Sequence, residues 1–516
     1  MAIRQLSLAL AVFAFAAPAG AAPPLSREAR VAAIIARHAD SPPALRVLLQ
    51  PMPKGGDLHN HLDGSVYAED YLKWASADGF CVDKISHALT PPPCSSAQVE
   101  ARDLVTRDPK FYQASIDALS MRNFVPGLGT GEVNGHDHTF ATFPRFSAVA
   151  ARHLADSLAV TRQQAAADHV SYIEQIADPQ AAFAPELIGG PPSDPDNWKE
   201  NLAAIEPKLP ALVAAARAEF DLAEARMRKQ LNCDKAYAEP GCAVHVHYLF
   251  FVLRTLQPRQ VYAQIALGYA LVAADPRFVG LNLVAPEDDP VALRDFGIQM
   301  GMFDTFREQH PEVKLSLHAG ELALGLVPPA ELGFHITDTY WRAGARRIGH
   351  GYSLPYETQA VELLKAMARD HVAVEINLTS NDITPGIRGA EHPLALYRAA
   401  GVPVTLSADD EGVFRIDLTH EYVRAVTEQH LGYLALKDIA RNGLEYSFLP
   451  GQSLWQQGDY RKIAPACAGA LPAAAATTPA CKAFLAASEK AALQWDFEAD
   501  VAAYEDAVLA GPFARP

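Results

Sequence analysis

Short apolar runs recur along the chain, and longer stretches with a helical spacing of apolar residues separate them. In each run, apolar residues either alternate with polar ones or follow one another without a break, as they do in β-strands. Eight such runs that alternate with helical segments predict a parallel (β/α)8 barrel. The runs are GGDLHNH (55–61), HVSYIEQIA (169–177), AVHVHYLFFVL (243–253), FVGLNLVAPE (278–287), VKLSLHAGE (313–321), ARRIGHG (345–351), VAVEINLTSN (372–381) and VPVTLSADDE (402–411).

The rest of the chain predicts three additions to a barrel domain of residues 51–450. A helical extension precedes it at 22–50, and a helical tail follows at 451–516. The connection after the first run is too long for an ordinary loop, so we expect an insertion at about 80–140 over the barrel mouth. Its glycine-rich stretch, 127–135, lacks the Gly-Lys-Ser/Thr ending of a phosphate loop and indicates a loop or lid.

The first residues have the pattern of a secretory signal peptide, 1–21. A basic start at Arg4 is followed by an apolar run, 6–17, and by the small-residue site Ala-Gly-Ala, 19–21. The apolar run is too short to cross a bilayer comfortably, and no later run reaches about 18 residues. We therefore expect an exported protein, periplasmic or extracellular, with no membrane segment after cleavage near Ala21. A retained N-terminal anchor is the alternative.

Cysteine usage agrees with export. The six cysteines fall into three couples that are close in sequence and flanked by turn-like segments. Other connectivities and free buried thiols stay open. Proximity favours three small-loop disulfides, Cys81–Cys94, Cys233–Cys242 and Cys467–Cys481.

The charge balance argues against a nucleic-acid partner. The chain has 60 acidic and 44 basic residues and a formal net charge of −16. That charge repels a polyphosphate backbone at long range. Small neutral or cationic substrates suit this field better.

The first run ends in two histidines, His59 and His61. Alternate residues of a strand point to the same side, so both imidazoles can reach one point. In a barrel of this type the carboxyl ends of the strands carry the site, and these histidines lie at such an end. A second pair, His245 and His247, begins its run, so we expect it to lie away from that face.

Three further runs end in residues that bind metals or transfer protons. They supply His318 with Glu321, then His350, then Asp409 with Asp410. Three neutral imidazoles and one carboxylate can hold zinc and leave a position for water, whose pKa the metal lowers to about 7. The alternatives are that His350 fills a glycine-flanked turn and that the two aspartates cap a helix.

Five segments in this order resemble the adenosine deaminase family of metal-dependent amidohydrolases. The likeness extends from Met52 to about Leu449 and is closest to the secreted branch, the adenosine deaminase growth factor type, in bacterial form. The segments are MPKGGDLHNHLDGS (52–65), SLHAGE (316–321), RIGHGY (347–352), EINLTSN (375–381) and TLSADDEGVF (405–414).

The resemblance implies hydrolytic deamination of adenosine or 2′-deoxyadenosine to the inosine form with release of ammonia. It implies one zinc ion per chain, held by His59, His61, His318 and Asp409. It also implies that Glu321 protonates the purine ring nitrogen beside the attacked carbon.

Substrate contacts follow from the same resemblance. His350 would position the hydroxide, Asp410 would contact the imidazole side of the purine, and Asp63 would contact the ribose hydroxyls. The family usually has a glycine whose amide meets the purine, but here Ala285 and Pro286 follow the fourth run. Alanine can still offer its amide, although glycine-only dihedrals would be excluded. Substrate fit is thus the least defined feature.

Other readings of the chain stay open. It could deaminate another 6-substituted purine nucleoside, or it could be an extracellular binding or signalling protein without turnover. The N-terminal helical stretch, 25–49, resembles the segment that dimerises the secreted branch, so a homodimer is a further expectation.

Overall fold

A computed structural model describes residues 26–188, 204–456, 458–470 and 478–514. The expected signal peptide, 1–21, lies outside these residues. Across the described ranges, no helix combines the length and the apolar composition that a membrane crossing requires.

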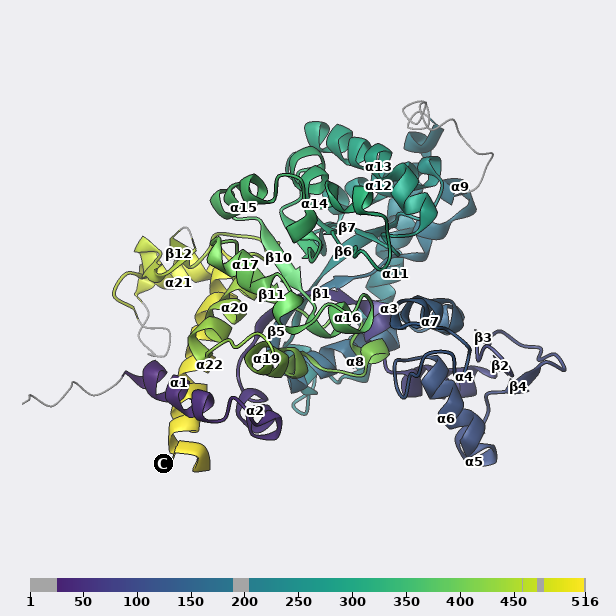
Figure 1. The fold of residues 1–516 in the computed structure, drawn as a ribbon, viewed down its shortest axis with the longest axis horizontal. Helices are drawn as coiled ribbons and strands as arrows, with labels where there is room; N and C mark the ends of the chain where they lie inside the picture. Colours follow the sequence, from purple (N-terminus) through teal and green to yellow (C-terminus); the bar gives the residue numbers. More distant parts are fainter. Residues whose placement is uncertain (1–25, 189–203, 457, 471–477, 515–516) are drawn as a thin grey trace, which may run out of the picture.

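Eight parallel strands form the barrel in chain order (Figure 1). The last strand returns to the first through a bridge between Asn60 and Asp409, which closes the sheet. The expected (β/α)8 barrel is therefore confirmed. Its strands are β1 (Gly55–His61), β5 (Val170–Ile176), β6 (His245–Leu253), β7 (Phe278–Val284), β8 (Lys314–Ala319), β9 (Arg347–His350), β10 (Ala373–Ile376) and β11 (Val404–Leu406).

Amphipathic helices cover the outside of the barrel. Helix α15 (Ala360–Arg369) is typical, since Leu363 and Met367 are fully buried while its charged residues face outward. Burying these apolar stripes supplies most of the folding free energy. The other main covering helices are α8 (Leu154–Ala167), α11 (Leu209–Gln230), α12 (Pro258–Ala274), α13 (Pro290–Gln309), α17 (Leu394–Ala399), α19 (Leu418–Thr427) and α20 (Tyr433–Glu445).

The long connection after β1 forms a separate small layer that projects from the barrel (Figure 1). A three-stranded antiparallel sheet of order β3-β2-β4 packs with helices around its own apolar cluster. Its last helix, α7, returns to the barrel mouth. The elements are α3 (Leu62–Ser65), α4 (Ala68–Asp78), β2 (Cys81–Asp83), β3 (Leu89–Thr90), β4 (Gln98–Glu100), α5 (Leu104–Arg107), α6 (Pro109–Ala118) and α7 (Gly135–Ala150).

Both ends of the described chain are helical and lie together. Glu505 of α22 (Glu489–Ala510) accepts hydrogen bonds from Arg27 Nε (2.8 Å), Lys437 Nζ (2.9 Å) and Tyr433 Oη (2.8 Å). The buried carboxylate therefore ties α1 (Arg27–Arg37) and α22 to α20. Helix α2 (Pro42–Leu49), the hairpin β12 (Trp455–Gln456) and β13 (Asp459–Ile463), and α21 (Pro479–Ala486) complete the two extensions.

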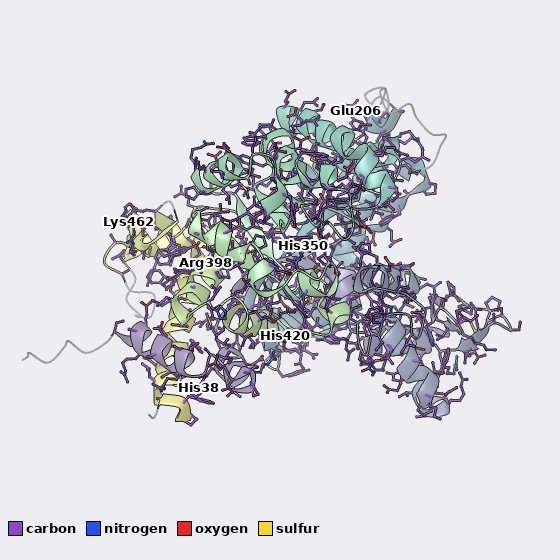
Figure 2. The ribbon with its side chains drawn as sticks, viewed as in Figure 1. His38, Glu206, His350, Arg398, His420 and Lys462 are labelled. Carbon is purple, nitrogen blue, oxygen red and sulfur yellow. A yellow bond between two sulfur atoms is a disulfide. The ribbon has the colours of Figure 1, made fainter. Side chains whose placement is uncertain are left out.

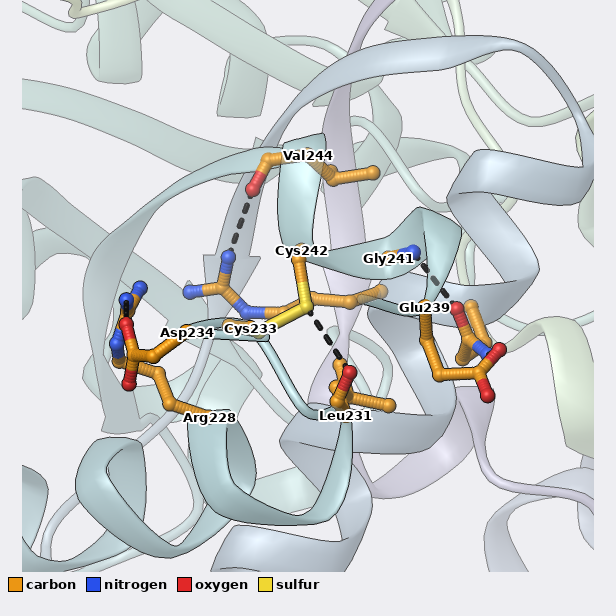
Figure 3. Close-up of a disulfide and its surroundings, with 10 residues drawn as sticks. Arg228, Leu231, Cys233, Asp234, Glu239, Gly241, Cys242 and Val244 are labelled. Carbon is orange, nitrogen blue, oxygen red and sulfur yellow. Dashed lines mark hydrogen bonds and ion pairs between the residues drawn. A yellow bond between two sulfur atoms is a disulfide. The ribbon is translucent and has the colours of Figure 1, made fainter. Parts of the chain in front are cut away.

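All three predicted disulfides are present. Each closes a short loop, with sequence separations of 13, 9 and 14 residues. Figure 3 shows the second one, where Cys242 Sγ also lies 3.3 Å from the carbonyl oxygen of Leu231 at the end of α11. The bonded pairs are Cys81–Cys94, Cys233–Cys242 and Cys467–Cys481.

The close approach of α20 to β1 yields a stability prediction. A Cβ atom at Gly443 would collide with the backbone of Gly56, so we expect Gly443→Ala to lower the free energy of unfolding by about 1–3 kcal/mol. Gly325→Ala, at an exposed turn position with open space around its Cβ position, should change it by less than about 0.5 kcal/mol. Urea unfolding measures both. Because alanine is otherwise the better helix former, a stabilising Gly443→Ala would contradict the contact.

Candidate active site

One cavity of about 570 Å³ opens at the carboxyl ends of the strands, beneath α7. Figure 2 places His350 near the middle of the molecule, among the strands. The ionisable residues that line the cavity are His61, Asp63, Asp178, Glu219, His318, Glu321, His350, Asp409 and Asp410.

Four imidazoles converge on Asp409. His59 Nε2 lies 3.6 Å from Asp409 Oδ1, and His61 Nε2 lies 3.4 Å from the same oxygen. His61 Nε2 also lies 3.2 Å from His318 Nε2. His350 Nε2 lies 3.8 Å from Asp409 Oδ2. The ligand atoms of His59, His318, His350 and Asp409 all lie within 4.8 Å of one another, whereas His61 groups with Asp409 and Asp410. Three of the four sequence-predicted ligands therefore share one cluster with His350, and His61 adjoins it through Asp409.

Contacts at Nδ1 orient two of the imidazoles. His59 Nδ1 is 2.8 Å from a Glu375 carboxylate oxygen, and His318 Nδ1 is 2.7 Å from Asn282 Oδ1. With each Nδ1 held, each Nε2 is left to face the cluster. His59 Nε2 is buried and has no hydrogen-bond partner among the described residues. An orphaned buried ring nitrogen beside a carboxylate fits a cation-binding site.

His350 is held in the same way, by a residue of the short helix α16 (Leu378–Ile383) that follows β10. Its Nδ1 lies 2.9 Å from Asn381 Oδ1, and Asn381 Nδ2 in turn lies 2.9 Å from His392 Nε2. Its Nε2 therefore points toward Glu321, whose Oε1 is 3.8 Å away. An imidazole fixed in this tautomer can accept a proton from a water or a substrate.

Glu375 connects the cluster to the barrel interior. Its other oxygen contacts Arg347 Nε and lies 2.7 Å from Ser316 Oγ, and Arg347 also pairs with Glu174. Burial acts to raise the pKa of Glu375, but Arg347 and His59 outweigh it and lower that pKa to about 2. The residue behind His59 is therefore a stable carboxylate.

Glu287 holds the loop that carries Glu321. Its carboxylate accepts hydrogen bonds from the amides of Glu321 (2.7 Å) and Gly320 (3.3 Å) and lies 2.6 Å from His335 Nδ1. Arg254 Nη1 lies 3.5 Å away. Despite burial, His335 and Arg254 lower the pKa of Glu287 to about 2. Sequence reasoning left this residue without a role, since its partners are more than 30 positions away.

Backbone strain gathers at the strand ends. Ala285, His350 and Asp409 have φ angles of 81°, 65° and 59°. Such left-handed conformations cost non-glycine residues of order 1–3 kcal/mol each and persist only where surrounding structure imposes them. The expectation that alanine excludes glycine-type dihedrals at position 285 is therefore wrong. Ala285 adopts the turn that glycine would favour, after β7.

Two motif glycines make room for site residues. A Cβ at Gly64 would overlap the Asp410 carboxylate, and one at Gly349 would lie 2.8 Å from His59 Cε1. The HLDG and RIGHG motifs thus combine a functional side chain with a glycine that admits its neighbour.

The expected substrate contacts line the same cavity. Asp63, Ala285 and Asp410 all reach it. Loss of water around Asp63 raises the pKa of its carboxyl to about 6. Burial, reinforced by the negative charge of Asp409, raises the pKa of Asp410 well above its usual value.

The remaining histidine pairs lie elsewhere. His245 and His247 begin β6 at the opposite end of the barrel, where His245 Nδ1 lies 3.2 Å from Glu489, as expected. In α7, His136 Nε2 lies 3.0 Å from Asp288 Oδ1, which connects the insertion to the loop after β7. Sequence reasoning did not identify this contact, because the two residues are 152 positions apart.

Comparison with known proteins agrees with this geometry. The model of the family described as adenosine deaminase matches residues 157–455, more than half of the chain. The chain is 40% identical over 122 residues to the aminodeoxyfutalosine deaminase of Streptomyces coelicolor, which covers 22% of this chain and 31% of the relative. It is 30% identical over 179 residues to the adenosine deaminase of Shewanella denitrificans, which covers 33% and 50%. These alignments span a third to a half of the curated relatives.

Solved structures share the fold. The apo N6-methyl-AMP deaminase of Arabidopsis thaliana is 18% identical, with a TM-score of 0.51, and covers 78% of this chain and 94% of that one. An amidohydrolase of Burkholderia ambifaria with bound zinc is 15% identical, with a TM-score of 0.50 and coverages of 78% and 88%. Family match, barrel and site residues agree, and this chain belongs to the adenosine deaminase family.

Proposed function

We propose that the protein is a metal-dependent aminohydrolase that converts adenosine or 2′-deoxyadenosine to inosine or 2′-deoxyinosine and ammonia. One observation carries this proposal: His61, His318, His350 and Asp409 line a single cavity together with Glu321 and Asp410. Metal ligands and a carboxyl group that can transfer a proton therefore face the same substrate space.

His59, His61, His318 and Asp409 would hold the metal, which we propose to be one zinc ion per chain. Nitrogen and carboxylate donors suit zinc, and the Nδ1 contacts of His59 and His318 leave their Nε2 atoms as donors. When bound, the ion supplies Lewis-acid activation of water at neutral pH. The Burkholderia structure with bound zinc has the same fold, which agrees with a zinc ion here. The similarity is one of fold and does not identify the ligand residues.

Glu321 would donate a proton to the ring nitrogen beside the attacked carbon. Burial, aided by the negative charge of Asp409, raises the pKa of Glu321, which favours a protonated carboxyl. Water then adds to carbon 6 and gives one proton to His350. The amino nitrogen takes that proton as its bond to carbon 6 breaks, and it leaves as ammonia. The proton of the new carbon 6 hydroxyl returns to Glu321, which leaves the carbonyl of the product. The protonated ring makes carbon 6 a better electrophile.

His350 would orient the attacking water and take up its proton. The Asn381 contact at Nδ1 leaves Nε2 as an acceptor, within 3.8 Å of both Glu321 and Asp409. Asp410 and the Ala285 amide would contact the purine, and Asp63 would contact the ribose. These three positions line the cavity.

We also propose that the protein is exported, as the first 21 residues suggest, and resembles the secreted family branch. Three disulfides support an oxidising compartment, since such bonds seldom persist in the cytosol. A homodimer through the N-terminal helices stays an additional proposal.

A second candidate is deamination of another 6-substituted purine nucleoside. The observation that favours it is the strained turn at Ala285, followed by Pro286, in the purine-facing wall. Ammonia release from adenosine, 2′-deoxyadenosine, adenine and AMP distinguishes the readings. We expect turnover of the two nucleosides and little from adenine or AMP. Inosine formation from N6-methyladenosine but not from adenosine would favour the second candidate. A zinc-loaded protein that is inactive on all five compounds would support a binding protein instead.

The proton donor is tested by Glu321→Gln. An amide cannot donate an acidic proton, so we expect kcat for adenosine to fall by roughly 10²- to 10⁴-fold. Zinc content, measured by atomic absorption, should stay at one ion per chain, because Glu321 is not a proposed ligand. Retention of full activity by Glu321→Gln would contradict the assigned role.

The support behind His59 is tested by Glu375→Gln. Losing the carboxylate should weaken zinc binding by about 10- to 100-fold in a chelator competition titration. Glu362→Gln, an exposed substitution on α15, is the matched control and should leave affinity unchanged. Circular dichroism checks that the Glu375 variant is folded. Equal affinities of a folded Glu375→Gln protein and the control would exclude this role.

The positioning role of Glu287 is tested by Glu287→Gln. An amide side chain cannot satisfy two backbone amides and His335 equally, so the Glu321 loop should shift. We expect kcat to fall by about 10²-fold with a small change in KM, and zinc content to stay at the wild-type level. Glu308→Gln, exposed on α13, is the control. A fall in stability with kcat unchanged would show a purely structural role.

A further inference from the structure

The cavity continues beyond the residues given roles above. It extends past Asp63 to the ends of β5 and β6, under α7. The residues that form this outer part are Asp178, Gln180, Phe183, Glu219 and Phe251. None of them belongs to the five segments that carry the family resemblance. We call this region the outer subsite.

Two carboxyl groups are fixed in the outer subsite by backbone amides. Asp178 Oδ1 accepts a hydrogen bond from the amide of Phe251 (2.8 Å), and Glu219 Oε2 accepts one from the amide of Gln180 (2.9 Å). These bonds hold both side chains in place. Asp178 Oδ2 is buried and has no hydrogen-bond partner among the described residues. A buried oxygen without a donor is costly and gains from a ligand that supplies one.

Acidic side chains continue outward from the metal cluster. Asp63, Asp178 and Glu219 line the same cavity as Asp409 and Asp410. A cationic hydrogen-bond donor is favoured beside such a group of carboxylates.

The rest of the outer subsite is apolar, and the lining carries no positive charge. The rings of Phe183 and Phe251 have centroids 6.3 Å apart, and those of Phe140 and Phe143 on α7 are 6.5 Å apart. No lysine or arginine lines the cavity within the described ranges. Phosphate and carboxylate groups would meet uncompensated negative charge there. Apolar linkers and hydrogen-bond donors are favoured.

The shape of the proposed substrate indicates which part of the nucleoside would lie in the outer subsite. Carbon 6 must reach the metal cluster, and the sugar is attached on the opposite side of the purine. The 5′ carbon is the exocyclic position of that sugar and can carry an extension. A group that lies beyond Asp63 is therefore a 5′ substituent.

On the basis of the proposed function, we propose that the outer subsite selects 6-aminopurine nucleosides whose 5′ substituent is apolar and ends in a neutral or cationic hydrogen-bond donor, with Asp178 as the residue that recognises the donor.

Product analogues test this proposal without requiring turnover. Calorimetry would compare 5′-S-(3-aminopropyl)-5′-thioinosine, inosine and inosine 5′-monophosphate with the zinc-loaded protein. We expect the amino compound to bind at least about tenfold more tightly than inosine and the phosphate to bind more weakly. Asp178→Asn should remove most of the preference for the amine. Equal binding of the amine and inosine by the wild-type protein would overturn the proposal.

A second subsite variant and a control variant accompany Asp178→Asn in the binding experiment. Glu219→Gln should reduce the same preference by a smaller factor, and it provides the test if Asp178→Asn does not fold. Asp221→Asn, an exposed substitution on α11, is the matched control and should preserve it. An unchanged preference in both subsite variants would refute the assignment. Turnover of adenosine is measured separately, so failure of the proposed reaction is distinguished from failure of the subsite.

Discussion

Two backbone hydrogen bonds at the seam of the barrel determine the geometry of the site. The amide of His61 donates to the carbonyl of Asp409 (3.1 Å), and the amide of Asp409 donates to the carbonyl of His59 (3.0 Å). These bonds join the first strand to the residues that follow the last one. They fix the carboxylate of Asp409 beside both imidazoles. Barrel closure and assembly of the cluster are therefore one event, and a sheet that stayed open would have no site.

A buried ionic network supports the cluster from inside the barrel. Glu375 of β10 contacts His59 of β1, Ser316 of β8 and Arg347 of β9, and Arg347 is paired with Glu174 of β5 and lies over the Phe448 ring at 3.7 Å. A buried ion pair adds little net stability compared with apolar packing, whereas loss of one partner is expensive. The network is better explained by its effect on orientation. It keeps the Glu375 carboxylate at Nδ1 of His59 and so fixes the direction of that imidazole. Strain at Ala285, His350 and Asp409 has the same origin, because the packed strand ends hold these turns in place.

Local patterns made the fold and the inner site predictable from the sequence. The eight strand runs, the His59 and His61 alternation and the three cysteine couples all depend on residues near one another in the chain. The missed features depend on distant partners. Glu287 contacts His335, and His136 contacts Asp288, across separations that carry no periodic signal. The Ala285 turn was missed because alanine disfavours positive φ, and the surrounding structure overrides that preference.

Electrostatics divides the cavity into two regions with different tasks. Near the cluster, the negative charge of Asp409 is placed against imidazoles and would be neutralised by a cation. Farther out, Asp63, Asp178 and Glu219 have no cationic side chain beside them in the cavity lining of the described chain. If the proposed function and outer subsite hold, the inner charge is compensated and the outer charge is not, so a purine would bind deeply while an anionic substituent would be rejected at the entrance. Phosphate exclusion would then arise from charges that take no part in the chemistry. The reaction and the choice of substrate can therefore vary independently on the same barrel.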